Sequence, residues 1–255
     1  MSSNQYDLLI IGAGVTGSAL LYLSTRYSNI NNIGVIEKYA APARVNSLSS
    51  NNSQTLHCGD IETNYTLEKA LQVQRAARML RNYCVAQPDA HHIIFKYPKM
   101  VLGVGKAECK LLKERFEIFG PHYPELKLLD KKDIARIEPN VAMIDDHFRE
   151  DEIIALGSTD EYTAVNFEAL SRSFVRQAQL LAEKDENKNV DVHYNQVIDN
   201  IEIEDDGFIV ETQGIPRRPE DEEFLESFMS KLFAGELDIG NHYRSFKLQL
   251  LSGDG

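Results

Sequence analysis

The sequence predicts an α/β fold with a doubly wound, mostly parallel sheet, and three observations near the N-terminus support this. An apolar run without proline or charge, residues 8–11, has the length and composition of a buried parallel strand. Three glycines at G-x-G-x-x-G spacing follow it and open an apolar helix; they are Gly12, Gly14 and Gly17. A second short apolar run then ends on Glu37, twenty residues beyond the last glycine.

Each part of this stretch has a physical role in holding a dinucleotide. The first glycine allows a tight turn, the second lets the backbone approach a pyrophosphate, and the third lets the helix lie close to the sheet. The helix N-terminus directs unpaired N–H groups at the phosphates, and the acid accepts hydrogen bonds from a ribose. An ordinary strand–turn–helix is the alternative, but the complete ordered pattern favours dinucleotide binding. The expected cofactor-binding residues here are Gly12, Ala13, Gly14, Val15, Thr16, Gly17, Glu37 and Lys38.

Length and composition are those of a globular protein with one large domain or two modest ones. The chain has 255 residues, of which 43% are hydrophobic, and no stretch approaches the length of a transmembrane segment. The N-terminus lacks the pattern of a signal peptide. With 39 acidic against 27 basic residues the net charge is −12, and no basic run suggests nucleic acid as a partner. The three cysteines lack metal-like spacing, so we expect reduced thiols and no metal site.

Helical and strand-like patterns alternate along the rest of the chain. We expect helices over residues 67–83, 106–119, 167–182 and 220–234, and a short helix before Pro139 that Asp130 or Asp133 caps. Strands are expected over residues 33–36, 93–95, 100–104, 190–194, 197–203 and 208–211. Thr66 is the expected N-cap of the helix that follows it, and the acidic turn at residues 205–207 predicts a hairpin. Residues 39–60 form a polar, loop-like segment.

Four blocks of sequence carry a resemblance to a known family. They are YDLLIIGAGVTG at 6–17, SSNNSQTLHCGDIETNYTLEK at 49–69, FKYPKMV at 95–101 and DEYTAVNFEAL at 160–170. In this order they resemble the FAD-dependent malate:quinone oxidoreductases, which belong to the amino-acid-oxidase-like flavoprotein superfamily. The glycine block is shared by many flavoproteins, whereas the second and fourth blocks point to this family. The resemblance covers the chain from about residue 6 to about residue 213.

The resemblance implies FAD as the cofactor and a Rossmann-like FAD-binding domain with part of a second, mixed α+β substrate domain. It places the N-terminal part of the FAD-binding domain at 1–90, the partial substrate domain at 91–150, and the return to the FAD-binding domain at 151–213. Residues 214–255 are then a non-matching acidic tail. Family members oxidise (S)-malate to oxaloacetate and pass the electrons to a quinone. They are peripheral proteins on the cytoplasmic face of the membrane, so the resemblance implies a cytoplasmic location with peripheral membrane contact.

The resemblance also implies roles for residues outside the glycine motif. Ser53, Gln54 and Thr55 are expected along the flavin, and Val197 is expected to meet the adenine through its backbone. Oxidation of an alcohol requires a base for the hydroxyl proton. His57 is the histidine in the flavin-side block and is the candidate catalytic residue; a purely structural role is the alternative.

Other features leave the substrate side open. A dicarboxylate needs cationic anchors, but no arginine pair can be assigned, and either Lys96 or Lys99 could touch the substrate. The alternatives to malate oxidation are another FAD-dependent 2-hydroxy-acid or amino-acid dehydrogenase, or a non-catalytic flavin- or partner-binding fragment. Family members are considerably longer, and residues from Gly214 onward do not match. We therefore expect this chain alone to bind FAD weakly, to leave malate unoxidised and to be poorly ordered after Gln213.

Overall fold

The structure, a computed structural model, describes residues 3–214 and 245–251, with the last range described by its backbone alone. The chain divides into two compact units, residues 1–52 with 167–255, and residues 53–166. The division falls at 52/53 and 166/167, whereas the expected changes of domain lie at 90/91 and 150/151. Helix α2 (Leu67–Val85) accounts for much of the difference, because its Ala70 packs with Leu112 and Phe119 of the second unit. The functional assignment of each unit stays a prediction.

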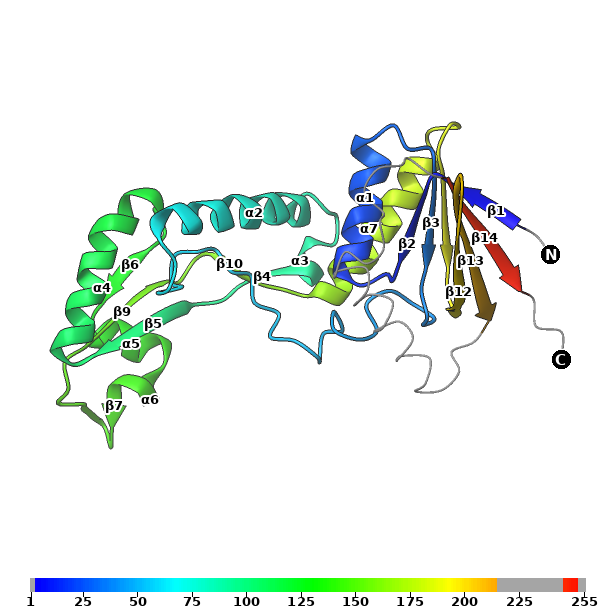
Figure 1. The fold of residues 1–255 in the computed structure, drawn as a ribbon. Helices are drawn as coiled ribbons and strands as arrows, with labels where there is room; N and C mark the ends of the chain where they lie inside the picture. Colours follow the sequence, from blue (N-terminus) through cyan, green and yellow to red (C-terminus); the bar gives the residue numbers. More distant parts are fainter. Residues whose placement is uncertain (1–2, 215–244, 252–255) are drawn as a thin grey trace. The chain divides into compact units, whose positions relative to one another are not determined.

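The first unit contains the predicted parallel sheet. Its strand order is β11 (Asn189–His193), β3 (Asn32–Ile36) and β2 (Leu8–Ile11), all parallel. Two helices, α1 (Val15–Tyr27) and α7 (Phe167–Ala182), lie side by side on one face of this sheet (Figure 1). The core of this layer consists of Ile10, Ala13, Leu21, Ile33, Val35, Val175 and Ala178. The buried apolar strands read from the sequence are thus confirmed.

A second sheet covers the other face. Its order is β1 (Ser3–Tyr6), β14 (Ser245–Leu251), β13 (Gly207–Gly214) and β12 (Gln196–Glu204). Strands β12 and β13 form the predicted antiparallel hairpin, with Glu204 opposite Gly207. The core between the two sheets consists of Tyr6, Leu9, Ile36, Ile198 and Val210. The parallel sheet is therefore buried on both faces, by helices on one and by strands on the other.

An antiparallel sheet forms the centre of the second unit, in the order β5 (Lys99–Val104), β9 (Ile153–Ser158) and β6 (Lys127–Leu129). Alternate residues of β9 face two different clusters, as the period of a strand requires. Leu156 packs with residues of α2 and α4 (Gly105–Phe119), whereas Ala155 packs with residues of α5 (Lys131–Ile137) and α6 (Pro139–Ala142). Both faces of this small sheet are thereby covered.

Short elements complete the second unit. Helix α3 (Ala90–Ile93) runs into β4 (Ile94–Lys96), which pairs with β10 (Tyr162–Val165). A 3-10 turn, η1 (Gly120–His122), follows α4, and β7 (Met143–Ile144) and β8 (His147–Phe148) form a tight hairpin. Figure 1 shows α3, β4 and β10 next to α2, and β7 next to α6.

Most predicted elements are confirmed, and the differences have physical causes. Thr66 caps α2 by accepting a hydrogen bond from the Lys69 backbone N–H, and Asp130 caps α5 in a capping box with Asp133. The strand expected to begin at Ile93 begins at Ile94, because Ile93 ends the short helix α3. The elements that the sequence did not predict are strands β1, β6, β7, β8, β9, β10 and β14 and the short helices α3 and α6. The expected helix at 220–234 lies outside the described residues. Poor order was expected after Gln213; of that segment the structure describes Gly214, which ends β13, and the backbone of residues 245–251, which forms β14.

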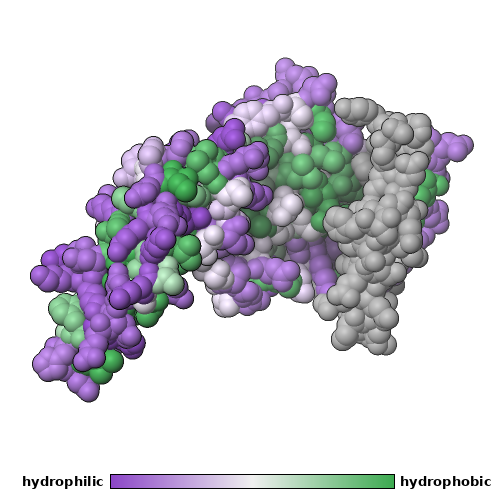
Figure 2. Space-filling model, turned by 60° about the vertical axis from the view of Figure 1, so that its left-hand side comes forward, coloured by the Kyte–Doolittle hydropathy of each residue, from purple (hydrophilic) through white to green (hydrophobic). Residues whose placement is uncertain are grey.

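The surface of the second unit mixes polar and apolar side chains. Figure 2 shows hydrophobic residues interspersed among hydrophilic ones on its visible face. Leu111 and Ile118 of α4 are more than half exposed. Among the residues that the structure describes, no helix combines the length and apolar character needed to cross a bilayer.

Candidate functional site

The three glycines of the first unit each meet a different constraint. Gly12 has φ +88°, which turns the chain out of β2, and its N–H donates to the Ile36 carbonyl oxygen at 2.8 Å. A Cβ on Gly17 would lie 1.9 Å from the Gly12 carbonyl oxygen, so only glycine allows this close packing. A Cβ on Gly14 would meet only Ser47 Oγ, at 3.5 Å, in ordinary contact. Folding alone therefore does not require glycine at position 14.

Glu37 lies at the end of β3 with its carboxylate fixed beside the glycine turn. Its Oε2 accepts from the Ala13 backbone N–H at 2.7 Å, and its Oε1 accepts from the Tyr39 N–H at 3.0 Å. The residue is only 7% exposed. Since a carboxylate has about four acceptor positions, two remain for further donors. This geometry presents a charged acceptor next to a helix N-terminus.

Two other predicted residues lie close to Glu37 in the first unit. The backbone N–H of Gln196 donates to the Glu37 carbonyl oxygen at 3.1 Å, which places the next residue, Val197, at the carboxyl end of β3. Val197 is buried. Lys38 Nζ lies 5.6 Å from the centre of the Tyr39 ring. The fold thus brings the glycine turn, Glu37, Lys38 and Val197 together, whereas their specific roles remain predictions.

Ser47 is a site residue that sequence reasoning missed. Its Oγ accepts from the Val15 backbone N–H at 3.0 Å, at the first turn of α1. The Ala43 N–H also donates to the Ala13 carbonyl oxygen at 3.1 Å, so this loop lies directly against the glycine turn. No pattern in the sequence singles out Ser47, because residues 39–60 contain several serines in equivalent polar surroundings.

Glu168, near the start of α7, anchors the loop that carries Ser47. Ser49 Oγ donates to its carboxylate at 3.2 Å, and Arg44 and Arg172 approach it at 3.6 and 2.8 Å. Burial raises the pKa of the Glu168 carboxyl, but Arg172 and Ser49 outweigh this and leave the pKa below its ordinary value. The anchor is therefore ionised at neutral pH.

The second unit contains a groove of about 640 Å³, whose lining includes two of the other predicted site residues, Thr55 and His57, but neither Ser53 nor Gln54. Segment 54–56 lies along β10, since Leu56 N–H donates to the Thr163 carbonyl at 2.8 Å and Val165 N–H donates to the Gln54 carbonyl at 2.7 Å. Thr55 and His57 line the groove, and Thr55 Oγ1 donates to the Ser53 carbonyl at 3.3 Å. His57 Nδ1 lies 2.7 Å from Glu62 Oε1, and its side chain is 62% exposed.

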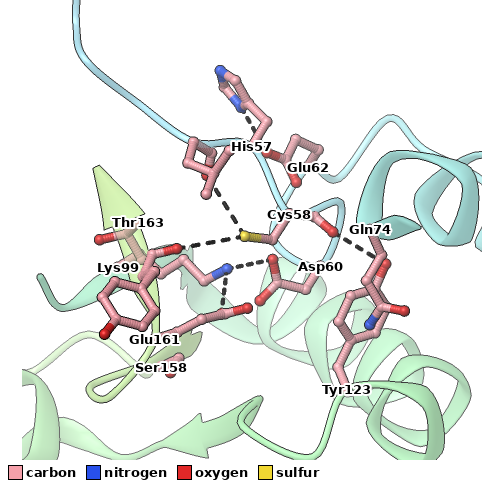
Figure 3. Close-up of polar contacts among 12 residues, drawn as sticks. His57, Cys58, Asp60, Glu62, Gln74, Lys99, Tyr123, Ser158, Glu161 and Thr163 are labelled. Atoms are coloured by element: carbon pink, nitrogen blue, oxygen red, sulfur yellow. Dashed lines mark hydrogen bonds and ion pairs between the residues drawn. The ribbon is translucent and has the colours of Figure 1, made fainter. Parts of the chain in front are cut away.

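A buried ion cluster lies beneath the turn that carries His57. Lys99 Nζ contacts Asp60 Oδ1 at 2.6 Å and Glu161 Oε2 at 2.7 Å. Burial lowers the pKa of the Lys99 ammonium, but the carboxylates outweigh it, and the pKa lies above its ordinary value. Figure 3 shows the His57 ring pointing away from this cluster. Both lysines that were considered as substrate contacts thus pair with carboxylates of the protein. Lys99 forms buried ion pairs with Asp60 and Glu161, and Lys96 forms an exposed ion pair with Asp160.

The cysteines are buried free thiols: Cys58, Cys84 and Cys109. Burial raises the pKa of the Cys58 thiol to about 12, so it is protonated at neutral pH and a poor nucleophile. Over the described ranges 3–214 and 245–251, no group of three His, Cys, Asp or Glu residues is placed to hold a metal ion.

A glycine-rich strand–helix turn, with a buried acid at the end of the next parallel strand, defines the dinucleotide-binding α/β fold. Two solved structures share it. L-proline dehydrogenase from P. horikoshii superposes with a TM-score of 0.57 at 16% identity, over 82% of this chain and 49% of that chain. L-α-glycerophosphate oxidase from Mycoplasma pneumoniae, solved with FAD bound, gives 0.52 at 22% identity, over 80% and 49%. These likenesses show that the chain shares the fold of these two enzymes over about half of their length.

Sequence comparison identifies the family. The model of the malate:quinone oxidoreductase (Mqo) family matches residues 4–223, and the chain belongs to this family. The probable malate:quinone oxidoreductase of Campylobacter jejuni is 45% identical over 216 residues, which are 83% of this chain and 47% of that protein. The malate:quinone oxidoreductase of Helicobacter pylori is 36% identical over 212 residues, 82% of this chain and 45% of that protein. The chain spans about half the length of these relatives.

Proposed function

We propose that this chain supplies the FAD-binding part, and a share of the substrate domain, of an enzyme that oxidises (S)-malate to oxaloacetate. The observation that carries the proposal is the Glu37 carboxylate, held by the Ala13 and Tyr39 N–H groups beside the glycine turn. Membership of the malate:quinone oxidoreductase family selects malate as the substrate and a quinone as the electron acceptor. A peripheral contact with the cytoplasmic face of the membrane belongs to the same proposal.

The residues of the first unit fit the adenosine and pyrophosphate of FAD. The two remaining acceptor positions of Glu37 suit the two hydroxyls of a ribose. Gly14 has no Cβ at the place where phosphate approaches the N-terminus of α1, and the Ser47 hydroxyl lies next to it. The adenosine and pyrophosphate half of the cofactor would be held by residues 12–17, Glu37, Lys38, Ser47 and Val197. The flavin would lie along Ser53, Gln54 and Thr55.

When bound, FAD supplies the acceptor for the two electrons that leave malate as a hydride. The remaining requirement is a group that takes the proton of the malate hydroxyl. We assign this to His57, whose Nδ1 is engaged by Glu62 and whose ring lines the groove of the second unit. Oxaloacetate results from the loss of one hydride and one proton, and the quinone then receives the two electrons.

Two measurements test this proposal. The first is titration of the purified chain with FAD, followed by flavin fluorescence, which tests the cofactor site by itself. The second is anaerobic bleaching of flavin absorbance by (S)-malate, with reoxidation by a soluble quinone analogue. Because the chain spans about half the length of its relatives, the second assay is also carried out on the Campylobacter jejuni relative.

Substrate analogues separate malate oxidation from its alternatives. Faster bleaching by 2-hydroxyglutarate, lactate or an amino acid than by malate would assign a different dehydrogenase of the same fold. FAD binding without bleaching by any of these substrates, in both proteins, would leave a flavin-binding protein without this activity. Failure of the chain to bind FAD at all would contradict the cofactor assignment.

A further inference from the structure

Glu62 is the partner of His57 in the second unit, and its environment is unusual for a residue in a turn. Its Oε1 lies 2.7 Å from His57 Nδ1, and the Glu62 side chain is only 15% exposed. Its second oxygen, Oε2, is buried and has no hydrogen-bond partner among the described residues. A buried carboxylate oxygen without a partner costs stability, so the position of Glu62 is not explained by the stability of the fold alone.

Arg115 of α4 fixes the backbone of this turn. Its guanidinium donates to the carbonyl oxygens of Glu62 at 2.7 Å, Tyr65 at 3.1 Å and Asp60 at 3.3 Å. The guanidinium carbon also lies 3.7 Å from the centre of the Phe119 ring. The planar fork of an arginine is suited to holding several acceptors in fixed directions. The backbone of the turn is therefore held in place, and it positions the Glu62 side chain next to His57.

Two more contacts restrain the turn from below. Gly59 has φ +91°, and a Cβ there would lie 2.5 Å from the Ala70 carbonyl oxygen of α2. Asp60 is held by Lys99 at 2.6 Å. Residues 59–62 are thus fixed at three points, whereas the His57 ring at their edge is exposed on the side of the groove. Among residues 59–62, the polar atom that forms a hydrogen bond with the His57 ring is Glu62 Oε1.

We propose that Glu62 is a positioning residue that holds neutral His57 in its Nδ1–H tautomer, with a bare Nε2 lone pair presented to the groove. A carboxylate accepts hydrogen bonds only, so the ring nitrogen facing it carries the proton and the other nitrogen is the acceptor. The use of this lone pair rests on the proposed function: Nε2 takes the malate hydroxyl proton while the hydride leaves C2. The imidazolium that forms donates from Nδ1 to the Glu62 carboxylate, which stabilises its charge.

The tautomer can be read directly by NMR on the chain labelled with ¹⁵N-histidine. Long-range ¹H–¹⁵N spectra at a pH where the ring is neutral distinguish a protonated from a bare ring nitrogen, and His57→Gln assigns the signal. We expect a protonated Nδ1 and a bare Nε2 in the unmodified chain. Glu62→Ala is expected to shift both nitrogens toward the opposite tautomer. Glu114→Ala removes an equally charged side chain from an exposed pair with Lys110 and should leave the signals unchanged.

A second variant keeps the test decisive if Glu62→Ala does not fold. Glu62→Gln retains an acceptor oxygen but no charge, so the Nδ1–H tautomer should persist while the imidazolium loses its partner. In the Campylobacter jejuni relative, the aligned substitution should lower kcat at least tenfold with little change in KM. Nε2–H as the main tautomer of the unmodified chain would overturn the inference. Unchanged nitrogen shifts in a folded Glu62→Ala variant would also overturn it.

The two proposals fail separately. The NMR measurement needs neither FAD nor malate, so a correct tautomer without malate oxidation would refute the proposed function and leave the positioning role of Glu62 intact. Malate oxidation with the opposite tautomer would do the reverse.

Discussion

The ring of Tyr6 on β1 lies against Gly34 on β3 of the facing sheet, and its hydroxyl reaches His193 on β11. A Cβ on Gly34 would come within 2.9 Å of two Tyr6 ring atoms, and the hydroxyl is 2.6 Å from His193 Nε2. The same hydroxyl donates to Asp191 at 3.0 Å. Because the His193 carbonyl accepts the Glu37 N–H at 2.8 Å, this contact supports the end of β3 that carries the acid. The missing side chain at position 34 thus makes room for a buried tyrosine.

The first prediction concerns this close contact. Gly34→Ala should lower the free energy of unfolding by about 1–3 kcal/mol, because the added methyl group overpacks the space that Tyr6 and Leu9 fill. Urea denaturation at neutral pH measures the change. Gly120→Ala is the control, since a Cβ there meets Phe116 only at ordinary contact distance. Equal stability of the two variants would contradict the packing argument.

The second prediction separates folding from cofactor binding in the glycine turn. Gly14→Val should abolish FAD binding and leave the fold largely intact, because the side chain occupies the space of the pyrophosphate while its Cβ clashes with nothing in the protein. Gly17→Ala should instead prevent stable folding, since its Cβ would lie 1.9 Å from the Gly12 oxygen. Circular dichroism and flavin fluorescence follow the two properties. Stoichiometric flavin in the Gly14→Val variant would refute the assignment of this loop.

The third prediction tests the proposed base. His57→Ala in the intact relative, at the aligned position, should reduce turnover about a hundredfold or more while flavin content changes little. Steady-state kinetics with malate and the flavin absorbance of the purified protein supply the two numbers. His92→Ala provides the control, because His92 is an exposed residue of α3. Unchanged turnover would leave His57 with a structural role only.

The fourth prediction addresses the buried ion cluster. Lys99→Met should destabilise the protein by about 3–5 kcal/mol, because it leaves the carboxylates of Asp60 and Glu161 without their cation. The matched control, Lys96→Met, breaks an exposed pair with Asp160 and should have little effect. Denaturant midpoints of the two variants give the comparison. A stable Lys99→Met variant would mean that the carboxylates find other compensation.

The fifth prediction is a loss of stability in alkali. Burial raises the pKa of the Cys58 and Cys84 thiols from 9.0 to about 12, so they stay protonated in the folded state where the unfolded chain ionises. Stability should therefore be full below about pH 9 and fall as the pH rises toward about 12. Cys84→Ala should flatten this fall by up to about 1.4 kcal/mol per pH unit. Urea unfolding at about pH 8 and about pH 10.5 measures both slopes; parallel slopes would contradict the argument.

Local chemistry made much of the fold predictable. The apolar run before Gly12, the cap at Thr66 and the amphipathic repeat of residues 167–182 are patterns whose physical cause lies within a few residues, and each element appears where expected. Strands β6 and β9 were missed because their burial depends on α4 and α5 packing from either side. Nothing in their local sequence specifies those partners.

The sequence by itself determined the dinucleotide motif, because glycine spacing and the acid at the end of the second strand act through backbone geometry. It also determined the family, through residues shared over most of the chain. Only the tertiary structure decided that Ser47 lies at the glycine turn, that Lys99 serves a buried ion cluster, and that Glu62 faces His57. Such contacts join segments through loops whose composition is compatible with many conformations. Their geometry is fixed by packing, which a linear pattern does not contain.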